Sequence, residues 1–138
     1  MFATIAVGLD GSATAGEAVR SAAELARRFD AELVLLSVFP TRGLVQSGGH
    51  EEDWATNPAA RQRESLDRTE ASLRESGVRT RSLVAEGDAG DVLVSLAEDC
   101  DADVLVVGSK GMERRVLGSV PNTVTHKARC SVLLVKTT

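Results

Sequence analysis

The stretch from Val104 to Ser119 combines glycines with cationic side chains directly after an apolar run. Its sequence is VLVVGSKGMERRVLGS. The residues that could do chemistry in it are Gly108, Ser109, Lys110, Gly111, Arg114, Arg115, Gly118 and Ser119. Backbone amides made accessible by glycine, together with positive side chains, are the groups that bind an anion. The expected ligand of this stretch is a phosphate chain.

A helix is predicted to begin where this stretch ends. Ser119 is a favourable N-cap residue, and Pro121 falls where an early-helix proline is tolerated. The free N–H groups and the positive end of the helix dipole would then point into the glycine-bearing loop. Two alternatives stay open, since each glycine alone fits an ordinary turn and each basic residue alone fits a solvated surface.

A second polar turn, GLDGS from Gly8 to Ser12, follows the first apolar segment. In open α/β sheets, ligands bind beyond the carboxyl ends of the strands, where the strand order reverses. If the strands before the two turns are neighbours, both turns border one crevice. Asp10 would then accept a hydrogen bond from a ribose hydroxyl or a base amine. Its alternative role is to cap a turn or the next helix.

Other phosphate and catalytic motifs do not fit this chain. Residues 11–18, GSATAGEA, have the glycine spacing of a P-loop, but Glu17 and Ala18 stand where lysine and a hydroxyl residue are required. The first turn lacks G-x-G-x-x-G, which disfavours a nicotinamide or flavin cofactor. No G-x-S-x-G elbow occurs in the sequence. A binding site is therefore favoured over a catalytic one.

The apolar pattern places these turns on an alternating α/β chain. Strands are predicted over Phe2–Gly8, Ala31–Phe39, Val78–Ala85 (an edge strand), Val104–Val107 and Ser131–Lys136. Helices are predicted over Ala13–Phe29, Ala59–Ser76, the segment from the Asp88 cap to Cys100, and Val120–Ala128, with a long loop over Thr41–Asn57. This alternation predicts an α/β three-layer sandwich with a five-stranded, mostly parallel sheet, which is a Rossmann-like architecture.

Composition limits the function classes. With 138 residues and 43% hydrophobic residues, the chain has the size of a single domain, residues 1–138. The absence of a long apolar run and of a signal-peptide pattern predicts a soluble, cytoplasmic protein without a membrane partner. A net charge of −4 and a single Trp argue against nucleic acid. Cys100 and Cys130 lack CxxC spacing and are predicted to be buried or half-buried thiols.

The whole chain resembles the universal stress protein family. The likeness is carried by IAVGLDGS, LLSV, EGD and VLVVGSKGMERRVLGSVPNTVTHKARCSVLLVK. ATP-binding members carry a phosphate loop of the form G-x2-G-x9-G-[ST]. Gly108 and Gly111 match its first half and Gly118 and Ser119 its second, but only six residues lie between the halves. The shortened loop leaves AMP and cyclic AMP open beside ATP. The resemblance implies the adenine nucleotide alpha hydrolase-like form of the fold.

The resemblance also implies a set of nucleotide-binding residues. Asp10 would contact the nucleoside, with Gly8 and Leu9 on the same wall, and the backbone of Val38 would recognise adenine. Ribose and phosphates would be held by Gly108, Ser109, Lys110, Gly111, Arg114, Gly118, Ser119 and Val120. No residue is implied as a metal ligand, although Mg²⁺ would accompany ATP.

The function implied is that of a cytoplasmic stress-response protein, a nucleotide-dependent sensor or regulator with an unknown protein partner. The resemblance further implies a homodimer formed through the strand Ser131–Lys136. One alternative is a slow ATPase or adenylate-transferring enzyme, in which Lys110 or an arginine stabilises the transferred group. Another is a dimeric interaction protein that binds no nucleotide.

Overall fold

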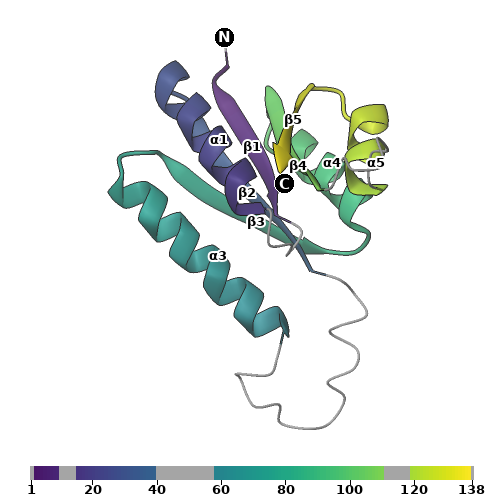
Figure 1. Ribbon diagram of the computed structural model, residues 1–138, viewed down its shortest axis with the longest axis horizontal. Coiled ribbons are helices and arrows are strands. Elements are labelled where there is room, and N and C mark those ends of the chain that lie inside the picture. The colour runs from purple at the N-terminus through teal and green to yellow at the C-terminus, as the bar shows by residue number, and fades with distance from the viewer. Residues whose placement is uncertain (1, 10–14, 40–57, 111–118, 138) are drawn as a thin grey trace, which may run out of the picture.

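Strands and helices alternate along the chain (Figure 1). The computed structural model describes residues 2–9, 15–39, 58–110 and 119–137, and the elements named here lie within those ranges. The strands are β1 (Thr4–Leu9), β2 (Glu32–Phe39), β3 (Thr80–Glu86), β4 (Val104–Lys110) and β5 (Ser131–Thr137). The helices are α1 (Ala15–Phe29), α3 (Pro58–Glu75), α4 (Ala89–Asp99) and α5 (Ser119–Lys127).

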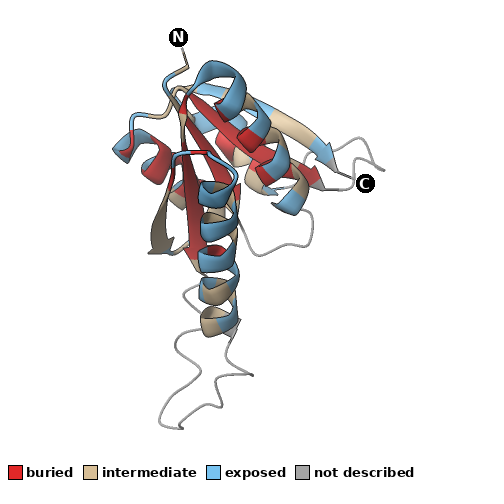
Figure 2. Ribbon diagram, turned by 90° about the vertical axis from the view of Figure 1, so that its left-hand side faces the viewer, coloured by how far each residue is buried: buried red, intermediate tan, exposed pale blue. Residues whose placement is uncertain are grey.

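The strands form one parallel sheet in the order β3-β2-β1-β4-β5. This arrangement confirms the predicted α/β fold, including the edge position of β3. The central strands β1, β2 and β4 are covered on both faces, which is why their apolar residues run consecutively instead of alternating. Figure 2 shows the buried residues concentrated in these strands and on the inner sides of the helices.

Each face of the sheet has its own hydrophobic core. On one face, Ile5 and Val7 of β1 pack with Ala18 and Ala22 of α1, and this core also includes a residue of α3. On the other face, Ala6 of β1 belongs to a core that includes residues of α4 and α5. The helices that follow β1 and β2 therefore cover one face, and those that follow β3 and β4 cover the opposite face (Figure 1).

Two predicted element boundaries beside the candidate site were wrong. The strand predicted to end at Val107 continues as β4 to Lys110, because β5 pairs with it in register as far as Lys110↔Thr137. A glycine at 108 therefore does not end the strand. The helix predicted to start at Val120 begins one residue earlier, at Ser119. Pro121 still lies in the first turn, where its missing N–H costs no helical hydrogen bond.

Capping and turn residues mark the ends of other elements. Asp88 caps α4, since its carboxylate accepts a hydrogen bond from the backbone N–H of Asp91 at 3.3 Å. Gly77 follows the end of α3 with φ +92°, and Gly87 forms the turn before α4 with φ +140°. Both are left-handed conformations that glycine adopts without a steric cost.

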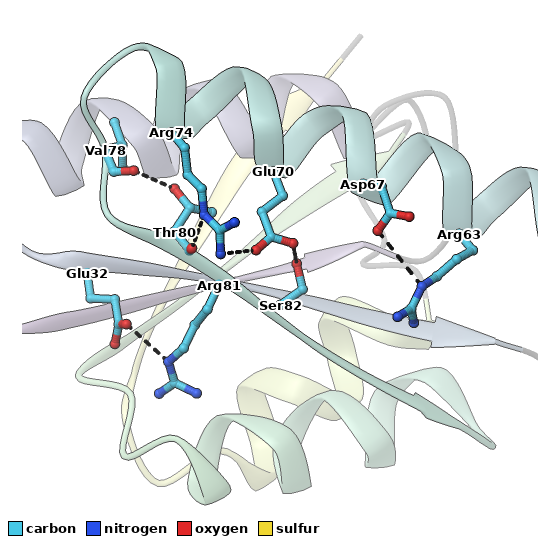
Figure 3. A network of polar contacts seen from close by, with 9 residues as sticks. All are labelled: Glu32, Arg63, Asp67, Glu70, Arg74, Val78, Thr80, Arg81 and Ser82. Carbon is cyan, nitrogen blue, oxygen red and sulfur yellow. Dashed lines mark hydrogen bonds and ion pairs between the residues drawn. The ribbon is translucent and has the colours of Figure 1, made fainter.

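Polar contacts hold α3 against the edge strand β3 (Figure 3). Glu70 of α3 accepts a hydrogen bond from the Ser82 hydroxyl at 2.7 Å, and it also pairs with Arg74. Arg74 in turn donates from Nε to the carbonyl of Thr80 at 3.0 Å. Because α3 has a thin apolar seam, centred on the buried Leu66, these contacts help to fix its position over the sheet.

Both cysteines are free thiols, with Cys100 buried and Cys130 half-buried, as predicted. Burial raises the pKa of each thiol above its ordinary value. Across the described ranges, no helix combines the length and apolar character needed to cross a bilayer. In the same ranges, no three His, Cys, Asp or Glu side chains gather in a way that could hold a metal ion.

Candidate functional site at the carboxyl ends of β1 and β4

The strand order reverses between β1 and β4. These two strands are neighbours, paired from Ile5↔Val104 to Val7↔Val106. The helix that follows β1, α1, covers one face of the sheet, and the helix that follows β4, α5, covers the opposite face. Connections that diverge in this way open a crevice beyond the carboxyl ends of the two strands. The adjacency on which the sequence prediction depended is therefore present.

At the end of β1, the two described site residues face opposite sides of the sheet. Gly8 is buried, and a Cβ on it would lie 2.8 Å from Cδ1 of Leu93 in α4. Leu9 is half-buried and packs against the core on the α1 face. Packing against α4 therefore accounts for a glycine at position 8, and only its backbone is available to a ligand. Asp10 lies outside the described residues.

The backbone of Val38 faces the crevice side of β2. In this strand, the Glu32 N–H donates to the Ala3 carbonyl on the β1 side at 3.0 Å, whereas the Phe39 carbonyl accepts from the Gly87 N–H on the β3 side at 3.1 Å. Successive residues of a parallel strand alternate between neighbours. Val38 lies an even number of positions after Glu32, so its N–H and carbonyl are also directed toward the β1 side. Its side chain is buried in the α4-side core.

Within the described residues, the last pair between β1 and β2 is Leu9↔Ser37, and residue 38 stands one position beyond it. Its carbonyl accepts a hydrogen bond from the side-chain amide of Gln62 in α3, with Nε2 at 3.0 Å. The same nitrogen lies 3.1 Å from the hydroxyl oxygen of Ser37. A side chain of α3 thus contacts the backbone position in β2 that is implied for adenine recognition.

At the end of β4, the structure differs from the predicted loop. Gly108, Ser109 and Lys110 are strand residues paired with β5, not the start of a loop. Ser109 is only 2% exposed, and its hydroxyl lies 3.5 Å from the carbonyl of Val135. Its side chain is therefore directed to the neighbouring strand. The remaining predicted residues of the phosphate loop, Gly111, Arg114 and Gly118, lie outside the described residues.

The first residues of α5 return to the same edge of the sheet. Because β4 and β5 are parallel, the connecting helix must start near the carboxyl end of β4. Ser119 is exposed at this end, and Val120 is half-buried against the α4-side core. The positive end of the helix dipole and its free N–H groups therefore lie on the side of the sheet where the crevice opens.

A surface cleft of about 560 Å³ lies at the opposite end of the strands, beside the last turn of α4 and the amino ends of β4 and β5. Three of its charged side chains already bind other groups of the protein. Asp103 accepts hydrogen bonds from the backbone N–H groups of Ala3 and Thr4 at 2.8 and 2.9 Å, and Glu98 pairs with Arg129 at 3.8 Å. The cleft is therefore separate from the predicted site.

Sequence reasoning missed Gln62. The apolar seam of this helix includes Ala59, Leu66 and Leu73, and position 62 lies three residues after the first and four before the second. That spacing puts Gln62 on the sheet-facing side of α3. A polar residue inside an apolar seam was the available signal, because a side chain there must find a hydrogen-bond partner.

Comparison with known proteins agrees with this architecture. The sequence model of the universal stress protein family matches residues 1–136. The chain is 34% identical over 146 residues to universal stress protein Rv1636 of Mycobacterium tuberculosis (strain H37Rv), an alignment that covers 99% of this chain and 98% of that protein.

Solved structures with the same fold include two that contain an adenine nucleotide. One is a universal stress protein in complex with cAMP, with a TM-score of 0.69 and 27% identity, covering 97% of this chain and 96% of that one. Another is the universal stress protein from Archaeoglobus fulgidus in complex with dAMP, with a TM-score of 0.70, 25% identity and 98% coverage of both chains. With a family match over nearly its whole length and the same fold, this chain belongs to the universal stress protein family.

Proposed function

We propose that this protein binds an adenine nucleotide at the carboxyl ends of β1 and β4. The observation that carries the proposal is the strand reversal there, because it brings the end of β1, the end of β4 and the start of α5 to one edge of the sheet. Relatives with the same fold, one bound to cAMP and one to dAMP, support an adenine nucleotide as the ligand.

We assign the base and the phosphates of the nucleotide to opposite ends of the site by the polarity of the groups there. The backbone of Val38 would hold the base, and Asp10 would accept a hydrogen bond from the ribose or the base, with the backbone of Gly8 and Leu9 beside it. The phosphates would lie toward the start of α5, where Ser119 and Val120 offer free N–H groups. In the sequence, the residues that would complete this end are Gly108, Ser109, Lys110, Gly111, Arg114 and Gly118.

We further propose ATP, accompanied by Mg²⁺, as a ligand, with AMP and cyclic AMP as alternatives. In this proposal residues 1–138 form one universal stress protein domain that acts in the cytoplasm as a nucleotide-dependent sensor or regulator. Signalling would pass to an unidentified protein partner. A homodimer paired through β5 is proposed because β5 is an edge strand and Leu133, at 38% exposure, is one of its residues.

Ligand-dependent stabilisation tests the proposal. Thermal unfolding with and without millimolar AMP, cAMP or ATP with Mg²⁺ is expected to show a higher melting temperature with at least one of them, because a ligand specific for the folded state stabilises it by mass action. Gly118→Val is expected to remove the shift by adding bulk at the phosphate end, and Asp10→Ala to reduce it. Ser65→Ala, at an exposed position of α3, is the control. Absence of any shift in the parent protein would reject the proposal.

A further inference from the structure

The side-chain amide of Gln62 donates hydrogen bonds to β2. Its Nε2 lies 3.1 Å from the hydroxyl oxygen of Ser37 and 3.0 Å from the carbonyl oxygen of Val38. A side-chain amide carries two N–H groups, so these two contacts use both. Ser37 is 1% exposed and Val38 3% exposed, and therefore water has little access to replace the Gln62 amide there.

The Val38 carbonyl is also the acceptor that the proposed site needs. It is directed toward the β1 side of the sheet, one residue past the last β1–β2 pair within the described residues, and it receives the Gln62 side-chain donor. The exocyclic amine of adenine is a donor of the same kind as the Gln62 amide. Both groups would therefore be directed to one carbonyl oxygen.

We propose that Gln62 is a specificity-determining residue of the nucleotide site, whose side-chain amide competes with the exocyclic amine of the base for the Val38 carbonyl. The inference rests on the proposed function and adds a residue of α3 to the site. A purine that carries an amine at this edge must either displace the Gln62 amide or share the Val38 carbonyl oxygen with it, and an oxygen that already accepts one hydrogen bond accepts a second one less strongly. A purine that lacks the amine gains nothing from that displacement. Gln62 thus lowers the affinity for adenine nucleotides selectively.

The test is a cycle that combines one substitution with one change in the ligand. Binding of AMP and of purine riboside 5′-monophosphate, which lacks the exocyclic amine, is measured by titration calorimetry on the parent protein, Gln62→Ala and Ser65→Ala. Gln62→Ala is expected to lower the Kd for AMP by about three- to tenfold, the usual range for one hydrogen bond, and to change the Kd of the analogue less than about twofold. Ser65→Ala, one turn further along α3, is expected to change neither.

Ser37→Ala gives an independent variant that leaves α3 intact. It removes one of the two acceptors of the Gln62 amide, so the same selective gain for AMP is expected, with a smaller size than for Gln62→Ala. This variant also answers the question if Gln62→Ala does not fold.

The inference is overturned if AMP and the analogue respond equally to Gln62→Ala, which would mean that α3 has shifted, or if AMP binds unchanged or more weakly. Those outcomes leave the proposed function standing, since the parent protein still binds. If the parent and all variants bind neither ligand, the proposed function itself is rejected, and the role of Gln62 is rejected with it.

Discussion

At the scale of single residues, close packing explains why position 8 is a glycine, whether or not a ligand binds there. A Cβ there would lie 2.8 Å and 3.0 Å from the two terminal methyl carbons of Leu93 and 3.4 Å from Cγ1 of Val107. We expect Gly8→Val to lower the free energy of unfolding by about 1–3 kcal/mol, because the added methyl groups overfill the α4-side core. Urea denaturation followed by circular dichroism measures the change.

Relief of the same contact provides the control for this prediction. The double variant Gly8→Val with Leu93→Ala is expected to lose less unfolding free energy than the two single variants lose in sum. The reason is that the valine side chain fills the space that Leu93 vacates. Additive losses would show that the strain at position 8 arises elsewhere, and the packing explanation for this glycine would then be incorrect.

At the scale of elements, α4 and α5 approach each other closely at one point. A Cβ on Gly90 of α4 would lie 2.7 Å from Cβ of Thr123 in α5, so a methyl group there must separate the two helices. We expect Gly90→Ala to destabilise the protein by about 1–3 kcal/mol, although alanine favours the helix. Gly16→Ala in α1 is the matched helical control. Among the described residues, its Cβ would meet only Nη1 of Arg20, at 3.8 Å, so this substitution is expected to be neutral or stabilising in the same denaturation experiment.

The elements also show what the sequence could and could not predict. Consecutive apolar residues identified β1 and β2, because strands covered on both faces have no polar side. The end of β4 was missed, since a glycine signals a break only when no neighbouring strand continues beside it, and β5 does continue to Thr137. In the candidate site, the adjacency of β1 and β4 was a condition of the sequence prediction, and the strand order meets it. The contact from Gln62 depends on where α3 lies over the sheet, which the sequence pattern does not specify.

At the scale of the whole molecule, the two edges of the sheet are protected differently. The edge strand β3 lies beside α3, whose Glu70 and Arg74 bind its residues (Figure 3). On the opposite edge, β5 carries Leu133, which is 38% exposed. An edge strand with an exposed apolar side chain is suited to pairing with another chain, whereas natural proteins that stay monomeric often place a charge there.

A charge introduced on β5 therefore tests the proposed homodimer. We expect the parent protein to sediment as a dimer and Leu133→Lys to sediment as a monomer, because a lysine on an edge strand must lose its hydration when two edges pair. Ser65→Lys adds the same charge at an exposed position of α3 and is expected to leave the dimer intact. Analytical ultracentrifugation over a range of concentrations distinguishes the two states. If Leu133→Lys remains dimeric with an unchanged dissociation constant, then this part of β5 does not form the interface, and the copies must meet through another surface.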